Sequence, residues 1–229
     1  MNREILRLEK LSIGYEVNKP ILTDISFCLA EGEVVGVAGP NGIGKTTLFK
    51  TILGIISPLQ GKIAFMNREL RTKADTSWAR SRIGYVPQGR NRGKLPLIVE
   101  EMVILGRWGT YFSGFQRPGE NDRWAAKKAM EIMGITKLRK RDCRELSGGE
   151  YQRAIITQAL AREASLLLLD EPGTFLDYES RQEFTMQLTE LRRTLPISIL
   201  IVSHHREEID NLVDRVLILG NRRKEVILS

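Results

Sequence analysis

An eight-residue segment, GPNGIGKT at residues 39–46, constrains the fold more than any other part of the sequence. It fits the pattern G-x-x-x-x-G-K-[ST], follows the apolar strand pattern EVVGVA and opens a helical pattern at Lys45. Glycines in such a loop let backbone N–H groups converge on phosphate oxygens, and the helix N-terminus adds the positive end of its dipole. Because strand, loop and helix occur in this order, the segment predicts a phosphate-binding loop. The alternative is a glycine-rich turn without a ligand.

The side chains of this loop have separate expected roles. We expect Lys45 to neutralise the β- and γ-phosphates of a nucleotide and the Thr46 hydroxyl to ligate Mg²⁺. Ile43 is bulkier than the small residue often found at its position, and we expect its side chain to point away from the nucleotide. The candidate nucleotide-binding residues of the loop are Gly39, Pro40, Asn41, Gly42, Ile43, Gly44, Lys45, Thr46 and Thr47.

A carboxylate that completes the metal site is expected in the segment LLLLDEP, residues 166–172. The apolar run predicts a buried strand, and Asp170 follows at its carboxyl end, where open α/β sheets bind ligands. We expect Asp170 to hold Mg²⁺ directly or through water, and Glu171 to polarise the attacking water as a general base. Acidic residues also end strands for structural reasons, but the phosphate loop favours the catalytic interpretation.

The strand patterns are of two kinds. In ILTDISFCLA, residues 21–30, apolar and polar side chains alternate, which predicts a half-buried antiparallel strand. Continuous apolar runs are typical of central parallel strands that are covered on both faces. Such runs occur at residues 33–39, 166–170 and 197–203.

Helical patterns lie between these strands, at residues 45–54, 121–134 and 178–193. Strands that alternate with helices predict an α/β fold of the P-loop NTPase type with a mostly parallel core sheet. The N-terminal strands add an antiparallel β subdomain. Residues of about 90–160 show helical patterns and no convincing strand, so we predict an inserted helical subdomain there.

Composition limits the class of protein. The 229 residues, 42% of them hydrophobic, can form one globular unit. A formal net charge of +7 suits phosphates, nucleic acid or anionic lipid headgroups, or serves solubility alone. Cys28 and Cys143 do not have the spacing of metal ligands, and the sequence shows no secretion signal. We therefore expect packed thiols rather than a disulfide. No apolar stretch reaches the roughly 18 residues of a membrane span, which predicts a cytosolic protein. If the protein works at a membrane, we expect it to do so by docking on an embedded partner.

The order of the motifs identifies a family. The phosphate loop is followed by ELSGGEYQR, residues 145–153, and then by LLLLDEPGTFLD, residues 166–177. This series resembles the ATP-binding-cassette (ABC) ATPases, and the resemblance extends over nearly the whole chain. It implies ATP and Mg²⁺ as cofactors.

The resemblance implies roles for single residues elsewhere. Tyr15 resembles the aromatic residue that stacks on adenine, and Gln88 the glutamine that links the metal and the water to the helical lobe. Asp177 resembles an aspartate at a subunit interface, and His204 the switch histidine at the γ-phosphate. His205 stands where an acidic residue is common, and we expect it to be exposed or to cap a helix.

In the family, the turn at Ser147, Gly148 and Gly149 reaches across a dimer interface to the γ-phosphate on the other subunit's phosphate loop. The residues suit this task, because Ser147 brings a hydroxyl and the glycines let backbone N–H groups approach closely. A helix beginning near Glu150 would point its positive end at the anion. One chain has one loop and one turn, so the resemblance implies a homodimer that ATP joins and hydrolysis releases.

We expect residues 1–229 to form a single cassette, with the helical subdomain inserted. The ending after Gly220 is short and basic and leaves no room for the C-terminal regulatory domain of some relatives. Gly173 stands where threonine is usual, a change that we expect to affect loop flexibility more than chemistry.

The segment at residues 96–123 resembles family members that drive uptake of metal ions or metal chelates. The expected partners are two membrane-embedded permease subunits, with an extracytoplasmic solute-binding protein as a further candidate and no nucleic acid. The expected location is the cytoplasmic face of the cell membrane. Basic clusters are candidates for contact with lipid headgroups or for simple solvation. They comprise Arg90, Arg92 and Lys94, residues 137–144, and residues 222–224.

Other functions stay open at this point. The positive charge would also suit a soluble ABC ATPase that acts on nucleic acid, ribosomes or iron-sulfur assembly, although the chain has one cassette and no heptad run. Exporters share the same catalytic residues as importers. A module that binds ATP without turnover is disfavoured, since Lys45, Asp170, Glu171 and His204 are all present.

Overall fold

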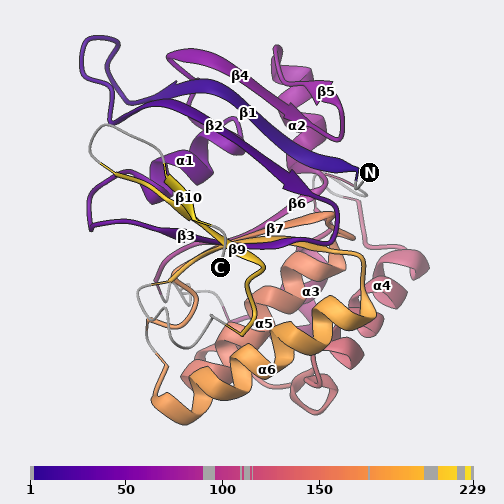
Figure 1. Cartoon of the computed structure of the whole chain (residues 1–229). Coiled ribbons are helices and arrows are strands. Elements are labelled where there is room, and N and C mark those ends of the chain that lie inside the picture. The colour runs from indigo at the N-terminus through magenta and orange to yellow at the C-terminus, as the bar shows by residue number, and fades with distance from the viewer. Residues whose placement is uncertain are drawn as a thin grey trace.

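Two β-sheets lie one above the other, with helices between them and beneath the second sheet (Figure 1). The computed structural model describes residues 3–89, 96–108, 110, 114, 116–174, 176–203, 211–220 and 225–227.

The first sheet is antiparallel and has the strand order β2-β1-β4-β5. Its strands are β1 (Glu4–Ile13), β2 (Leu22–Ala30), β4 (Gln60–Phe65) and β5 (Arg68–Glu69). In β2, Ile25, Phe27 and Leu29 are buried and Ser26 is exposed, as the alternation in the sequence predicts. The predicted half-buried antiparallel strand is confirmed, because β2 pairs antiparallel with β1 and one face of the sheet covers a core.

The second sheet has the order β10-β9-β3-β8-β7-β6. It contains β3 (Val34–Ala38), β6 (Ile83–Val86), β7 (Leu166–Asp170), β8 (Ser198–Val202), β9 (Arg215–Ile218) and β10 (Glu225–Ile227). Neighbouring strands from β9 to β6 run parallel, while β10 adds an antiparallel edge. The mostly parallel core sheet is thus confirmed, whereas β6, β9 and β10 were not anticipated from periodicity.

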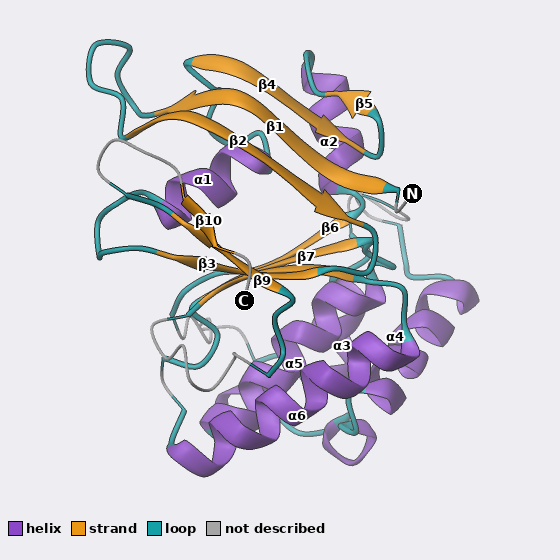
Figure 2. Cartoon of the chain, in the orientation of Figure 1, coloured by secondary structure: helices purple, strands orange, loops and turns teal. Residues whose placement is uncertain are grey.

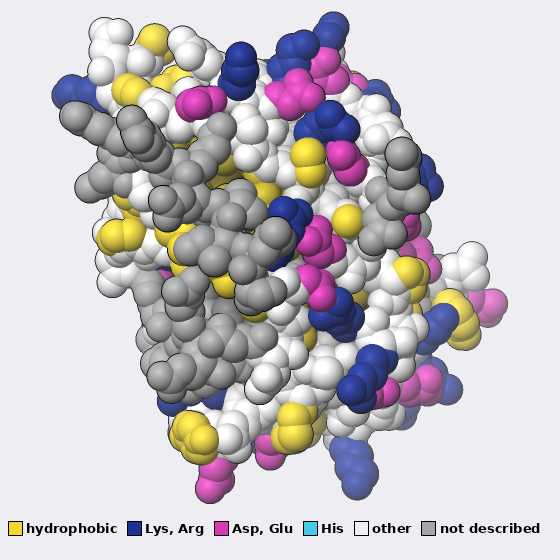
Figure 3. Space-filling view, viewed as in Figure 1, with side chains coloured by type: hydrophobic (Ala, Val, Ile, Leu, Met, Phe, Trp, Pro, Cys, Tyr) yellow, Lys and Arg dark blue, Asp and Glu magenta, His cyan; other side chains and the backbone are white. Residues whose placement is uncertain are grey.

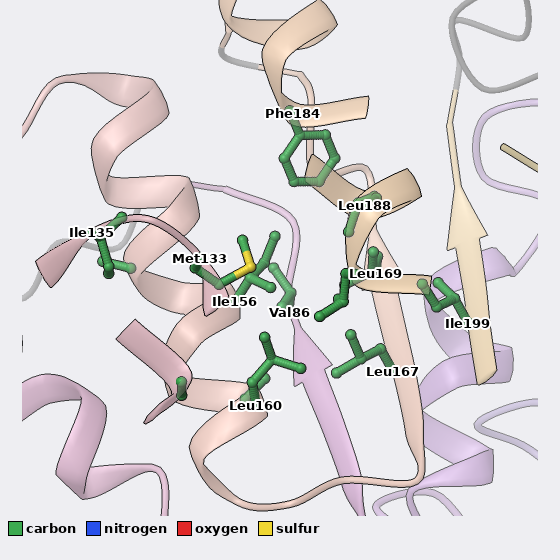
Figure 4. Close-up of a cluster of buried hydrophobic side chains, with 14 of the residues drawn as sticks. Val86, Met133, Ile135, Ile156, Leu160, Leu167, Leu169, Phe184, Leu188 and Ile199 are labelled. Carbon is green, nitrogen blue, oxygen red and sulfur yellow. The ribbon is translucent and has the colours of Figure 1, made fainter. Parts of the chain in front are cut away.

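Side chains of the central strands alternate between two separate cores. Leu166 and Leu168 join the core beneath the antiparallel sheet, while Leu167 and Leu169 join the core on the helical side. Figure 4 shows Leu167 and Leu169 beside side chains of the helical layer, with Phe184 above them. Because both faces are buried, every position of β7 is apolar up to Asp170, which explains the unbroken run in the sequence.

The helices form two groups (Figure 2). In the first group, α1 (Lys45–Ile52) lies between the sheets and α2 (Lys73–Arg80) lies beside the antiparallel sheet. In the second group, α3 (Val99–Leu105), α4 (Glu120–Ile132), α5 (Gly148–Ala161) and α6 (Tyr178–Thr194) cover the other face of the core sheet. The three predicted helices correspond to α1, α4 and α6.

Within residues 96–160, the described segments contain α3, α4, α5 and short 3₁₀ turns at Thr136–Leu138 and Cys143–Glu145. Strand-like pairing in this part of the chain is an isolated bridge between Ile98 and Asp142. The division into one cassette domain with an inserted helical subdomain stays a prediction.

Cys28 is half-buried and Cys143 is buried, and both are free thiols, as expected. Burial raises the pKa of each thiol. In the part of the chain that the structure describes, no helix is both long enough and apolar enough to cross a membrane.

Candidate active site

The predicted phosphate loop connects β3 to α1, and two of its glycines are required by geometry. Gly39 has a φ of 153°, and a Cβ there would lie 2.6 Å from the carbonyl oxygen of Leu219. Gly44 has a φ of 113°, and a Cβ there would lie 2.7 Å from Ile21, the residue before β2. Both backbone conformations favour glycine. Because Gly44 is also the N-cap of α1, no side chain caps this helix terminus.

The polar side chains of the loop point in different directions. Lys45 is buried, and its Nζ donates to the carbonyl oxygens of Gly39 at 2.8 Å and Pro40 at 3.1 Å. Thr46 Oγ1 donates to Asp170 Oδ2 at 2.8 Å, which joins the loop to the end of β7. Ile43 is buried in the core beneath the antiparallel sheet, in agreement with the expectation that its side chain points away from a bound nucleotide.

Asp170 is 1% exposed, and its two carboxylate oxygens have different surroundings. Oδ2 accepts hydrogen bonds from Thr46 and, at 3.3 Å, from the hydroxyl of Tyr85 on β6. Oδ1 is buried and has no hydrogen-bond partner within the described residues. Burial raises the pKa of Asp170, and the hydrogen bond from Thr46 offsets only part of this effect. A buried acceptor without a partner is costly in a native protein and indicates a position for an ion or a water molecule.

Glu171 has a φ of 51°, which is uncommon for a residue with a side chain and is typical of functional positions. Its carboxylate Oε2 accepts from Gln88 Nε2 at 2.6 Å and from Thr174 Oγ1 at 3.2 Å. The structure therefore brings Glu171 and Gln88 together, while their predicted roles toward water and metal stay predictions. Thr174 and Tyr85 were not identified from the sequence, since no motif singled them out and only the fold brings their hydroxyls to the carboxylates.

The turn before α5 is a capping box. Ser147 Oγ accepts from the backbone N–H of Glu150 at 3.2 Å, and the Glu150 carboxylate accepts from the Ser147 N–H at 2.7 Å. The hydrogen bond from the Ser147 backbone is the main reason that the pKa of Glu150 lies below its usual range. The helix begins at Gly148, and a Cβ on Gly149 would lie 3.3 Å from Ser180 Oγ of α6. Within the described residues, no hydrogen bond joins Ser147 to the phosphate loop of the same chain.

The remaining predicted residues are Asp177, Tyr15, His204 and His205. Asp177 is the N-cap of α6 and accepts from the Ser180 N–H at 2.8 Å, which lowers the pKa of its carboxyl. Tyr15 is 66% exposed in the connection between the first two strands. His204 and His205 lie outside the described residues, so their predicted roles stay predictions.

Only one of the predicted basic clusters, residues 137–144, lies in the described ranges. There, Arg141 pairs with Glu150 at 2.8 Å and Arg144 pairs with Asp142 at 2.6 Å. Figure 3 likewise shows described Lys and Arg side chains interspersed with Asp and Glu on one face of the molecule. Ion pairing within the chain favours solvation over lipid contact for these two arginines.

Two stacked sheets, a phosphate loop and a capped glycine turn are the features of an ATP-binding cassette. Comparisons with known proteins lead to the same class. A family model described as ABC transporter matches residues 22–174, and the chain belongs to this family. It is an ABC-type ATPase that binds ATP and is coupled to transport as part of a complex with membrane subunits.

Several relatives are similar over almost the whole chain. The high-affinity zinc uptake system ATP-binding protein ZnuC of Bacillus subtilis is 34% identical over 223 residues, covering 96% of this chain and 93% of that protein. The manganese transport system ATP-binding protein MntB of Halalkalibacterium halodurans is 35% identical, covering 97% and 84%. Among solved structures, CbiO1 of Clostridium perfringens, part of the ABC transporter complex CbiONQ, has a TM-score of 0.87 at 30% identity, covering 99% and 88%.

Proposed function

We propose that this chain is a Mg²⁺-dependent ATPase whose two identical copies drive permease subunits for uptake of a metal ion or metal chelate. The 2.8 Å hydrogen bond between Thr46 and Asp170 carries the catalytic part of the proposal. It joins the predicted phosphate-binding loop to the proposed metal-binding carboxylate, which supports the arrangement that phosphoryl transfer to water requires.

The chemistry of the side chains fits a magnesium ion. Mg²⁺ prefers oxygen ligands and is usually held by one or two carboxylates together with phosphates and water. Thr46 Oγ1, the unpartnered Oδ1 of Asp170 and the side-chain carbonyl of Gln88 are the candidate oxygens. Since the described residues contain no cluster of three or more His, Cys, Asp or Glu that could hold a metal ion, ATP phosphates would complete the site. A magnesium ion held there would neutralise part of the charge on the phosphates.

We assign the general base to Glu171. Its hydrogen bonds from Gln88 and Thr174 hold the carboxylate beside the metal-binding aspartate. Lys45 would exchange its bonds to loop carbonyls for bonds to the β- and γ-phosphates. His204, which lies outside the described residues, keeps its assignment as the γ-phosphate switch.

We infer that a second copy completes each site. Ser147, Gly148 and Gly149 form the N-terminus of a helix of 14 residues, a good site for an anion. Within the described residues Ser147 makes no hydrogen bond to its own phosphate loop, which supports a γ-phosphate on the partner copy as the proposed target. Tyr15, which is largely exposed, is assigned to adenine, and Asp177 to the interface between the copies.

The cargo is inferred from the relatives. The ATP-binding proteins of a zinc uptake system and of a manganese transport system are among the proteins that resemble this chain over more than nine-tenths of its length. We therefore assign it to the cytoplasmic face of the membrane, with two permease subunits and an extracytoplasmic binding protein as partners and no role for nucleic acid.

Glu171→Gln tests the catalytic assignment. The variant should bind Mg-ATP, lose at least about 100-fold in hydrolysis because it lacks a general base, and accumulate as a dimer. Gel filtration with ATP and a phosphate-release assay measure both effects. Glu131→Gln, at an exposed position on α4, is the matched control and should behave as wild type. A Glu171→Gln protein that stays monomeric in ATP would refute the dimer.

Uptake of radioactive Zn²⁺ and Mn²⁺ tests the cargo. Cells that lack this chain should take up less of one of these ions, and only the catalytically intact chain should restore uptake. Unchanged uptake of both ions, together with normal ATPase activity of the purified chain, would reject the metal cargo but leave the ATPase assignment in place.

A further inference from the structure

Tyr85 lies on β6, opposite Leu168 of β7 in a parallel pair. Leu168 and Asp170 are two positions apart and therefore project from the same face of the sheet. The half-buried Tyr85 packs against the core beneath the antiparallel sheet, and its hydroxyl reaches Oδ2 of Asp170 at 3.3 Å. The phenol thus approaches the predicted metal-binding carboxylate from a neighbouring strand.

Two hydroxyls hold the same carboxylate oxygen. Thr46 donates to Oδ2 from the phosphate loop at 2.8 Å, and Tyr85 donates to it from the sheet. With Oδ2 held from two sides, rotation of the carboxylate is restricted, and Oδ1 keeps its full acceptor capacity. Hydrogen bonds of this kind orient ligating carboxylates.

We propose that Tyr85 is a positioning residue whose hydroxyl fixes the Asp170 carboxylate in one orientation and so strengthens Mg²⁺-dependent nucleotide binding. The inference rests on the proposed function, because it requires Asp170 to be the metal-binding carboxylate. It is specific to the hydroxyl, since the ring contributes to core packing that phenylalanine would preserve.

The size of the effect follows from the contact. Loss of a partner that orients a metal ligand typically costs about 10- to 100-fold in metal affinity or activity. Here the distance of 3.3 Å exceeds that of a usual hydroxyl hydrogen bond, and Thr46 remains as a second donor. We therefore expect about a three- to tenfold effect from Tyr85→Phe.

The experiment measures the affinity of the full chain for a fluorescent non-hydrolysable ATP analogue, once with Mg²⁺ and once with EDTA. The ratio of the two affinities gives the contribution of the metal. Tyr85→Phe should lower this ratio about three- to tenfold by weakening binding in Mg²⁺ only. Thr157→Val is the matched control, because it removes a buried hydroxyl that bonds to the Arg153 carbonyl of α5 at 2.8 Å, and its ratio should equal that of wild type.

Asp170→Asn separates failure of the inference from failure of the proposed function. If Asp170→Asn leaves the ratio unchanged, the metal site is wrong and the inference fails with it. If Asp170→Asn lowers the ratio but Tyr85→Phe does not, the positioning role alone is overturned. The positioning role would also be overturned if Tyr85→Phe weakened binding of the ATP analogue equally in Mg²⁺ and in EDTA, since that result indicates a purely structural residue. Tyr85→Met, which also lacks the hydroxyl, should reproduce the lowered ratio if Tyr85→Phe folds poorly.

Discussion

Replacing Arg107 with methionine should destabilise the chain by about 3 kcal/mol, near the lower end of the cost of breaking a buried ion pair. Arg107 is 4% exposed and Asp122 is 7% exposed, and their atoms Nε and Oδ1 are 2.7 Å apart. The substitution strands the carboxylate and removes the donor that lies 2.8 Å from the Ala161 carbonyl. The cost stays near the lower end because the Gly119 N–H still donates to Asp122 at 2.8 Å, while Glu163 is exposed enough to be solvated.

Urea unfolding at pH 7 without nucleotide measures this loss directly. For a chain of this size, the midpoint temperature of thermal unfolding should fall by about 6–12 °C. Asp122→Asn keeps an oxygen that can accept from Gly119 but removes the buried charge. The double variant should therefore lose at least about 1 kcal/mol less than the sum of the single losses. A loss of less than about 1 kcal/mol in the free energy of unfolding for Arg107→Met would show that the ion pair between Arg107 and Asp122 adds little stability. Simple additivity of the two single losses in the double variant would show the same.

The same pair predicts a pH dependence. Burial raises the pKa of Asp122, but the hydrogen bonds from Arg107 and Gly119 outweigh this effect and leave the pKa below its usual range. A carboxyl whose pKa is lower in the folded state than in the unfolded state stabilises the fold. This stabilisation is complete at a pH above the unfolded-state pKa of about 3.9, and it is lost as the pH falls through the folded-state pKa. The difference in stability between wild type and Arg107→Met should therefore narrow below about pH 4.

Three further changes test separate parts of the molecule. Ser147→Arg should abolish hydrolysis while ATP affinity of the monomer stays within about twofold by equilibrium binding, and a collapse of that affinity would contradict the role across the interface. Gly106→Ala should cost about 1–3 kcal/mol in urea unfolding, because a Cβ there would meet the Gln158 carbonyl, and a neutral result would mean that α3 and α5 separate easily. Hydrogen bonds from Thr72 lower the pKa of Asp75 to about 2, so NMR should show it titrating near pH 2 and Thr72→Ala should raise that midpoint.

The sequence was sufficient for elements that repeat a regular pattern. Alternation in β2 and unbroken apolar runs in β3, β7 and β8 report directly whether one or both faces of a strand are buried. The edge strand β6 is only four residues long, and β5 only two, so neither carries enough periodicity to be recognised. Helix α2 has a single buried residue, Ala79, and its apolar stripe is correspondingly weak.

The candidate catalytic residues could be named from the sequence to the extent that the motifs include them. Asp170 and Glu171 follow a strand pattern, and Gln88 was assigned through the family. Thr174 lies only three residues from Glu171, yet its hydrogen bond to that carboxylate depends on how the intervening turn closes. Sequence spacing alone does not give the conformation of such a turn.

By itself, the sequence determined the kind of chemistry, because a phosphate loop and an acidic strand end are local patterns whose backbone needs are met within a few residues. Tertiary structure alone decided which groups meet at the carboxylates. Tyr85 is 85 residues from Asp170 in the sequence, and only the adjacency of β6 and β7 brings its hydroxyl within 3.3 Å. Strand order is set by the burial of both sheet faces at once, which is a property of the whole fold and of no single segment.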